Sequence, residues 1–141
     1  MSFQMWSTIS DQMNIQYIDI TQYKLLPHEK ITLKNLNHML DSLLVSEYDH
    51  KFPIYVDYET GVILDGHHRY HAAMMLGMQF VTISFVDYLK NDLIGFISDK
   101  DISKKDIVIH AQKNILLPSK TTKHYFNIEN RKYFLSDIFI S

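Results

Sequence analysis

The sequence of residues 62–86 predicts a strand, a short helix and a second strand, with no linker between these elements. The apolar run VIL ends at Asp65, and apolar residues then recur at helical spacing until Gly77 stops the helix. The segment QFVTISFV at 79–86 has the apolar, β-branched character of a buried strand. A strand, helix and strand in direct succession predict parallel pairing of the two strands and a mixed α/β domain.

The same periodicities predict three further elements before residue 62. Alternating apolar and polar residues over 14–20 indicate a half-buried strand, and the loop LLPHEK follows it. Helical spacing begins at Leu33 and continues to Leu44. FPIYVDYETGVILDG indicates two strands joined by a tight turn, in which Gly61 supplies a positive φ.

The sequence pattern of the C-terminal part predicts one more helix and a final core segment. Ser103-x-x-Asp106 resembles a capping box and opens a helix that continues to Ile115. The loop PSKTTKH follows at 118–124, and residues 133–140 are apolar enough to return to the core as a strand or a helical turn. We therefore expect an α+β fold with one small mixed sheet and about three helices.

Length and composition predict one globular domain over residues 1–141, with residues 1–13 as a candidate for a poorly ordered N-terminal arm. The chain has no cysteine, which suits a reducing compartment, so we expect a cytoplasmic protein. No basic and apolar leader and no run of ~20 apolar residues is present, so no membrane partner is expected. A net charge of -2 with scattered lysines argues against nucleic acid as a partner. The pattern leaves the oligomeric state open.

Three polar clusters stand in loops or at helix starts, and they are Pro27-His28-Glu29, Asp65-Gly66-His67-His68-Arg69 and Ser119-Lys120-Thr121-Thr122-Lys123-His124. The middle cluster follows a strand and opens a helix, where unpaired N–H groups and the helix dipole favour an anion. Gly66 has no Cβ to obstruct a phosphate oxygen, and Arg69 and the histidines can add charge-assisted hydrogen bonds. This pattern indicates a phosphate site, although Asp65 can also be a plain N-cap.

The clusters also allow other interpretations. His67 and His71 lie four residues apart on one helical face, as zinc ligands do, but no third ligand is evident. PSKTTKH offers hydroxyl and lysine donors for phosphate oxygens, but taken by itself it is more typical of a solvated turn. Glu29 gains a chemical use only if the fold brings it to the phosphate site, where a carboxylate can orient or deprotonate an attacking hydroxyl.

In the order and spacing of KLLPHE, ILDGHHRYHAAMMLG, FVDY and SKTTKH, the chain resembles the free L-serine kinases of the ParB/sulfiredoxin (ParB-like nuclease domain) superfamily. The resemblance runs from about Ile18 to the C-terminus. It implies a compact ParB/sulfiredoxin-like domain that transfers a phosphoryl group from ATP or ADP, with Mg²⁺, to free L-serine. The product would be O-phospho-L-serine.

The resemblance also implies residue roles. Glu29 would be the catalytic base for the serine hydroxyl, and Asp65 would help arrange hydroxyl, phosphoryl group and magnesium. The nucleotide phosphates would be held by two groups of residues, Gly66, His67, His68 and Arg69 at the helix start and Lys120, Thr121, Thr122 and His124 in the second loop.

The chain departs from the archaeal members in having only the short stretch 89–103 where they carry a long additional segment. This leaves open the choice of ATP or ADP, the adenine contacts and activity itself. Sulfiredoxin needs a cysteine and partitioning ParB proteins carry a helix-turn-helix domain, and this chain shows neither. Two alternatives therefore stand beside the kinase: a non-catalytic, regulatory nucleotide-binding module, and a metal-dependent phosphodiesterase or nuclease built on Asp65, His67 and His71.

Overall fold

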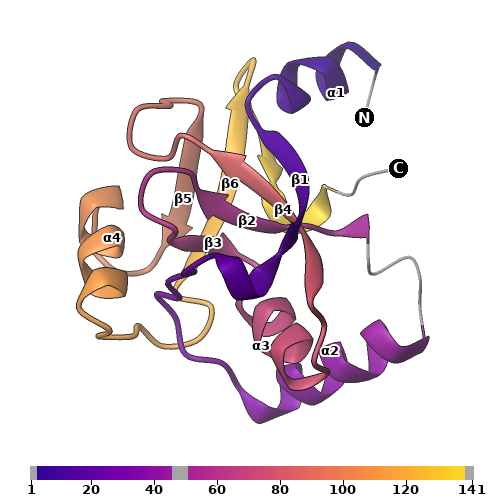
Figure 1. The fold of residues 1–141 in the computed structure, drawn as a ribbon. Helices are drawn as coiled ribbons and strands as arrows, with labels where there is room; N and C mark the ends of the chain where they lie inside the picture. The colour runs from indigo at the N-terminus through magenta and orange to yellow at the C-terminus, as the bar shows by residue number, and fades with distance from the viewer. Residues whose placement is uncertain (1–2, 46–50, 139–141) are drawn as a thin grey trace.

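The computed structural model describes residues 3–45 and 51–138 (Figure 1). The helices in this part of the chain are α1 (Phe3–Ser10), α2 (Leu33–Val45), α3 (His67–Met75) and α4 (Lys104–Gln112). The strands are β1 (Asn14–Asp19), β2 (Ile54–Asp57), β3 (Ile63–Asp65), β4 (Phe80–Val86), β5 (Ile94–Ser98), β6 (Thr122–Ile128) and β7 (Arg131–Phe134). Two short 3₁₀ turns, η1 (Ile20–Gln22) and η3 (Leu135–Asp137), complete the elements used below.

The strands form two sheets rather than the one small sheet expected. The first has the order β1-β4-β2-β3 and the second the order β5-β6-β7. In the first sheet β4 pairs antiparallel with β1 and parallel with β2, so that sheet is mixed. The second sheet is antiparallel throughout. The mixed α+β class is therefore confirmed.

The predicted parallel pairing of β3 with β4 is wrong. Gly61, at φ 78°, lies in the tight turn that joins β2 to β3, and this hairpin reverses the chain direction. Helix α3 then carries the chain past β2, and β4 runs parallel to β2, with Ile54 opposite Ile83. The sequence pattern identified a parallel pair but not its members, because periodicity does not show which strand a crossover reaches.

Helices α2 and α3 pack side by side at one end of the first sheet, and α4 lies apart from them beside the second sheet (Figure 1). The capping box of α4 is confirmed, because the Ser103 hydroxyl accepts from the Asp106 N–H and the Asp106 carboxylate accepts from the Ser103 N–H. Ile107 and Ala111 on α4 are buried. The cap therefore fixes the start of a helix that contributes to the core.

Several segments differ from the sequence-based expectation. Residues 3–10 form helix α1 instead of a poorly ordered arm, because Ile9 is fully buried in the core. Strand β5 lies within the stretch 89–103, and β6 begins at Thr122 inside the predicted PSKTTKH loop. The final apolar segment is both a strand and a helical turn, β7 and η3, and its predicted last residues 139–140 lie outside the described residues.

One hydrophobic cluster joins the two sheets. Its buried members come from α1, both sheets, the turn after β4, α4 and η3, and include Ile9, Tyr55, Tyr88, Ile94, Ile107, Phe126 and Leu135. The two sheets therefore share a core, and the loops between them are held close together. Within residues 3–45 and 51–138, no helix has both the length and the apolar character needed to cross a membrane.

Candidate active site

A cavity of about 270 Å³ lies where three distant parts of the chain meet. Its wall contains Glu29, the segment Asp65 to Arg69, and both Lys120 and Thr122, together with Met39 from α2 and Ser136 from η3. The convergence expected from the sequence is thus present in the structure. The Glu29 carboxylate, the start of α3 and the turn that carries Lys120 all line this cavity.

The start of α3 forms one side of this cavity. Gly66 is the N-cap residue, at φ 101°, and no side chain caps the first turn within the described residues. A Cβ at Gly66 would come within 3.3 Å of the Ile54 Cα, so a larger residue would strain both the backbone and its packing against β2. Asp65 is therefore not the N-cap, and the uncapped N–H groups have the geometry that favours an anion.

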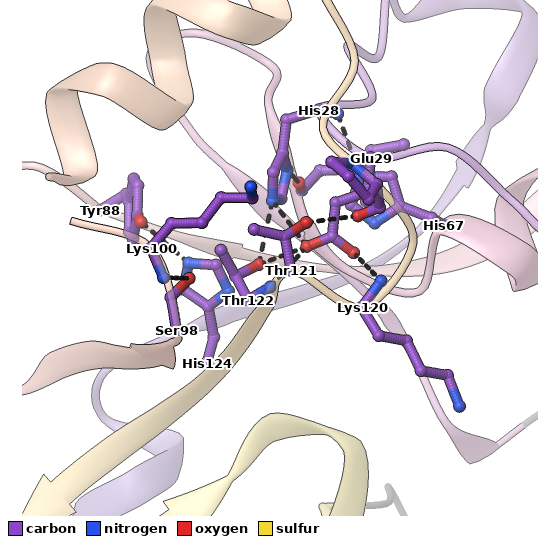
Figure 2. Close-up of polar contacts among 12 residues, drawn as sticks. His28, Glu29, His67, Tyr88, Ser98, Lys100, Lys120, Thr121, Thr122 and His124 are labelled. Carbon is purple, nitrogen blue, oxygen red and sulfur yellow. Dashed lines mark hydrogen bonds and ion pairs between the residues drawn. The ribbon is translucent and has the colours of Figure 1, made fainter. Parts of the chain in front are cut away.

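Glu29 lies opposite and is tightly held. Its Oε1 accepts from the Lys120 N–H at 3.1 Å, and its Oε2 accepts from the Thr122 N–H at 2.9 Å and the Thr122 hydroxyl at 2.6 Å (Figure 2). Burial raises the pKa of Glu29, but the hydrogen bonds from His28 and Thr122 outweigh it and lower the pKa to about 2. Glu29 is therefore a carboxylate at neutral pH.

The two histidines at the start of α3 act as hydrogen-bond acceptors. The Nε2 of His67 accepts from the His28 N–H at 3.1 Å, and the Nε2 of His68 accepts from the Thr32 N–H at 3.0 Å. Burial lowers the pKa of both rings, that of His67 to about 3. These neutral rings hold the 28–32 loop against α3 and do not act as cations toward a phosphate.

The second loop contributes fewer cavity residues than expected. Lys120 and Thr122 line the cavity, whereas Thr121 and His124 do not. Thr121 is buried and its hydroxyl donates to the Pro118 carbonyl. His124 is 2% exposed and pairs with the Tyr88 hydroxyl at 2.8 Å, because Thr122 already begins strand β6 and the strand carries His124 into the core.

His28 is the residue of this region that sequence reasoning did not select. Its ring is fully buried and lies among Glu29, Thr122 and His67 (Figure 2). Its Nδ1 is 2.7 Å from the Ile63 carbonyl, and its Nε2 is 3.1 Å from the Thr122 hydroxyl. The only signal in the sequence was its position directly before the acid in Pro27-His28-Glu29.

Asp65 is the second acid of the cavity. Burial raises the pKa of its carboxyl to about 6, and the nearby Arg69 guanidinium partly opposes that shift. A Mg²⁺ ion that arrives on nucleotide phosphates needs only one or two protein carboxylates, and it keeps water and phosphate oxygens as its other ligands. A carboxylate at the cavity wall beside a helix N-terminus fits that ion.

The zinc interpretation needs a third ligand beside His67 and His71. Across residues 3–45 and 51–138, the structure has no group of three or more histidine, aspartate or glutamate side chains arranged to hold a metal ion. His71 instead lies against the Tyr70 ring, with the ring centroids 5.3 Å apart.

Comparison with known proteins gives one sequence relative and several solved structures. No family model matches the chain. A ParB-like protein of Sulfolobus acidocaldarius is 35% identical over 75 residues, which cover 53% of this chain and 37% of that protein. The match thus covers well under half of the relative's length.

The solved structures cover most of the chain. A mutant of free serine kinase in complex with AMP has a TM-score of 0.66 and 12% identity, over 89% of this chain and 93% of that one. SbnI with a C-terminal truncation, from Staphylococcus aureus, has a TM-score of 0.62 and 13% identity, over 86% of this chain and 87% of that one. The resemblance inferred from the motifs is therefore confirmed at the level of fold.

Proposed function

The chain has the fold of free serine kinase and of SbnI, and on this premise we propose that it transfers a phosphoryl group from ATP or ADP to the hydroxyl of free L-serine. The supporting observation is that Glu29 shares one cavity with Asp65, the uncapped start of α3 and Lys120. Phosphoryl transfer needs an anion cradle, a group that orients the attacking hydroxyl and positive charge near the transferring group. The residues that line the cavity offer a candidate for each of the three.

The start of α3 would bind the phosphates through the N–H groups that follow Gly66, with Arg69 and the Lys120 ammonium adding positive charge. Glu29 would accept a hydrogen bond from the serine hydroxyl and take its proton as the new O–P bond forms. Because its pKa is about 2, Glu29 is a weak base. Its main contribution would be to orient the hydroxyl, which suits a loose phosphoryl-transfer transition state.

Magnesium, when bound with the nucleotide, would neutralise charge on the phosphate oxygens. Asp65 would hold this ion. The nucleotide itself is supported by solved structures of the same fold, in which free serine kinase mutants are in complex with AMP and with ADP.

A ³¹P NMR assay tests the proposal. The protein is incubated with Mg²⁺, with ATP or ADP, and with free serine, threonine or homoserine. We expect an O-phosphoserine resonance with serine. No phosphorylated product from any of the three amino acids would refute the kinase.

Glu29→Gln separates chemistry from binding. We expect this variant to lose at least about a hundredfold in turnover, since an amide cannot take the hydroxyl proton and orients the hydroxyl less strongly than a carboxylate. Calorimetry should still show nucleotide binding, because Glu29 is not among the groups proposed to hold phosphate. The control is Glu59→Gln, a change at an exposed carboxylate that pairs with Lys90, which should leave both measurements unchanged.

One observation favours the regulatory module as a second candidate. The amides of Lys120 and Thr122 are already bonded to Glu29, and the Thr121 N–H is bonded to the Pro118 carbonyl. The second loop therefore offers the Lys120 side chain rather than a set of free amides. Nucleotide binding by calorimetry without turnover of any hydroxy amino acid would establish the module in place of the kinase.

A further inference from the structure

His28 occupies a buried position in which both ring nitrogens meet oxygen atoms. Nδ1 lies 2.7 Å from the Ile63 carbonyl oxygen, which can only accept a hydrogen bond, so Nδ1 carries a proton. Nε2 lies 3.1 Å from the Thr122 hydroxyl oxygen and 3.4 Å from the Glu29 Oε2. Whether Nε2 carries a proton then depends on whether either oxygen has a proton to donate to it.

The Thr122 hydroxyl has one proton, and the 2.6 Å contact places it toward the Glu29 carboxylate. The hydroxyl oxygen then faces Nε2 with a lone pair, so a proton on Nε2 is needed to make this contact attractive. The backbone N–H groups of Lys120 and Thr122 also donate to the carboxylate, one to each oxygen. Donors to both oxygens favour an ionised Glu29, and with it a doubly protonated His28.

The charged groups around His28 are consistent with this assignment. The His67 ring lies 4.6 Å away and the His124 ring 6.0 Å away, centroid to centroid, and burial lowers the pKa of each to about 3. Both neighbours are therefore neutral. Glu29 is the carboxylate in contact with His28, so a charge on His28 has its counter-ion at hand.

We infer that His28 is a positioning residue, protonated on both ring nitrogens, whose charge acts directly and through Thr122 to hold Glu29 as a carboxylate fixed at the cavity wall. The inference deepens the proposed function and depends on it for its catalytic meaning. His28 itself contacts neither phosphates nor serine in this scheme. It acts by keeping Glu29 ionised and in place to orient the acceptor hydroxyl.

The protonation state can be measured without any enzymatic assay. Protein labelled with ¹⁵N-histidine gives long-range ¹H–¹⁵N correlations for each ring, and the His28 signals are those missing from His28→Gln. We expect two protonated ring nitrogens for His28 at neutral pH. A ring with an unprotonated Nε2, whether Glu29 is ionised or protonated, overturns the inference.

The effect on Glu29 is measured by ¹³C NMR of labelled glutamate carboxyl groups. In the wild-type protein Glu29 should remain ionised at pH 4, in line with its pKa of about 2. In His28→Gln the midpoint of Glu29 protonation should rise by about one pH unit or more, because a neutral donor replaces a cation. An unchanged midpoint contradicts the role given to His28.

Kinetics then compare two amide variants. The amide nitrogen of Gln lies near the former Nε2 and preserves a donor to Thr122, whereas that of Asn lies near Nδ1 and preserves only the bond to Ile63. We expect kcat to fall about tenfold in His28→Gln and about a hundredfold in His28→Asn, with nucleotide Kd nearly unchanged. Equal kcat values for the two variants would indicate a merely structural role.

A matched control is His110→Gln. The Nδ1 of His110 also pairs with a backbone carbonyl, that of Ile115, at 2.8 Å, but on the surface of α4. This variant should leave kcat and the Glu29 titration unchanged. If the wild-type protein makes no phosphoserine, the proposed function fails alone, because the two NMR measurements still decide the charge of His28 and its effect on Glu29.

Discussion

Glu29 and Asp65 line the same cavity, yet their carboxyl pKa values move in opposite directions. Burial raises the pKa of both groups, but at Glu29 the hydrogen bonds from His28 and Thr122 outweigh it. The result is a pKa of about 2 for Glu29 and about 6 for Asp65. Two acids with separated pKa values can serve different roles in one site.

The pH dependence of stability should reveal Asp65. Its folded-state pKa of about 6 exceeds the ordinary 3.8, so the native state binds this proton more tightly than the unfolded state. The ionised carboxylate then costs stability at pH 7, and this cost disappears below about pH 4, where both states are protonated. Asp65→Asn should raise the free energy of unfolding at pH 7 by about 1–2 kcal/mol and change it little at pH 4.

Urea unfolding at the two pH values measures this difference. Asp101→Asn, at an exposed position, serves as the control and should show no such pH-dependent gain. An Asp65→Asn variant that is destabilised equally at both pH values would contradict the expected cost of the buried charge.

Asp65 should also set the acidic limit of the proposed kinase activity. As the pH falls through about 6 the carboxylate is protonated and loses its attraction for Mg²⁺. The value of kcat/KM for the nucleotide, which reports groups of the free enzyme, should therefore fall about tenfold per pH unit below that value. Rates measured from pH 5 to 8 test this, and a flat profile between pH 5 and 7 would remove Asp65 from the proposed mechanism.

At the scale of residues, the sequence predicted which clusters meet but not how each side chain is used. The resemblance to free L-serine kinases implied that Glu29 and Lys120 share a site, and both line the cavity. The burial of Thr121 and His124 did not follow from the motifs, because it depends on where β6 begins and on the partner strand β5. The role inferred for His28 depends on contacts with Ile63 and Thr122, which are 35 and 94 residues away in the chain.

At the scale of elements, α4 shows how a local sequence signal fixes a helix that the core needs. The Ser103 and Asp106 side chains cap its first turn reciprocally, and Ile107 is fully buried one residue later. Losing the cap would leave N–H groups unpaired at the start of a helix that packs against the core shared by the two sheets.

Ser103→Ala should lower the free energy of unfolding by about 1 kcal/mol, since the alanine leaves the Asp106 N–H without its acceptor. Chemical unfolding measures this loss. Lys105→Ala, two residues further on the exposed side of α4, provides the control and should change stability by less than about 0.5 kcal/mol. Equal losses in the two variants would show that the cap is energetically unimportant.

Elements with strong local signals were predictable and those that depend on tertiary contacts were not. Helices α2, α3 and α4 and strands β1 to β4 follow periodicity, caps and glycines close to their observed bounds. Helix α1 and strands β5 and β6 were missed, because α1 is held by the burial of Ile9 and β5 and β6 form by pairing with each other. The pairing of β4 with β2 instead of β3 is likewise a property of the assembled sheet.

At the scale of the whole molecule, the shared core makes the two sheets one cooperative unit. Tyr55 of the first sheet and Phe126 of the second belong to the same buried cluster. A change at either should weaken both sheets together.

Phe126→Ala should lower the free energy of unfolding by about 3–5 kcal/mol, as for other fully buried aromatic residues. Hydrogen exchange should show faster exchange of amides in β4 as well as in β6. The control is Phe80→Ala, which removes a ring that is 43% exposed on β4 and should cost under about 1 kcal/mol. Undiminished protection of β4 in the Phe126 variant would mean that the two sheets unfold separately.

Glu29 accepts hydrogen bonds from Lys120 and Thr122, so the site can form only late in protein synthesis. While the ribosome is still translating the middle of the chain, His28 and Glu29 have emerged but the residues that complete their environment have not. Ribosome-bound intermediates that end before Thr122 therefore carry an open carboxylate and no finished cavity. The site becomes competent for ligand only when the chain as far as Thr122 has been made and has left the exit tunnel.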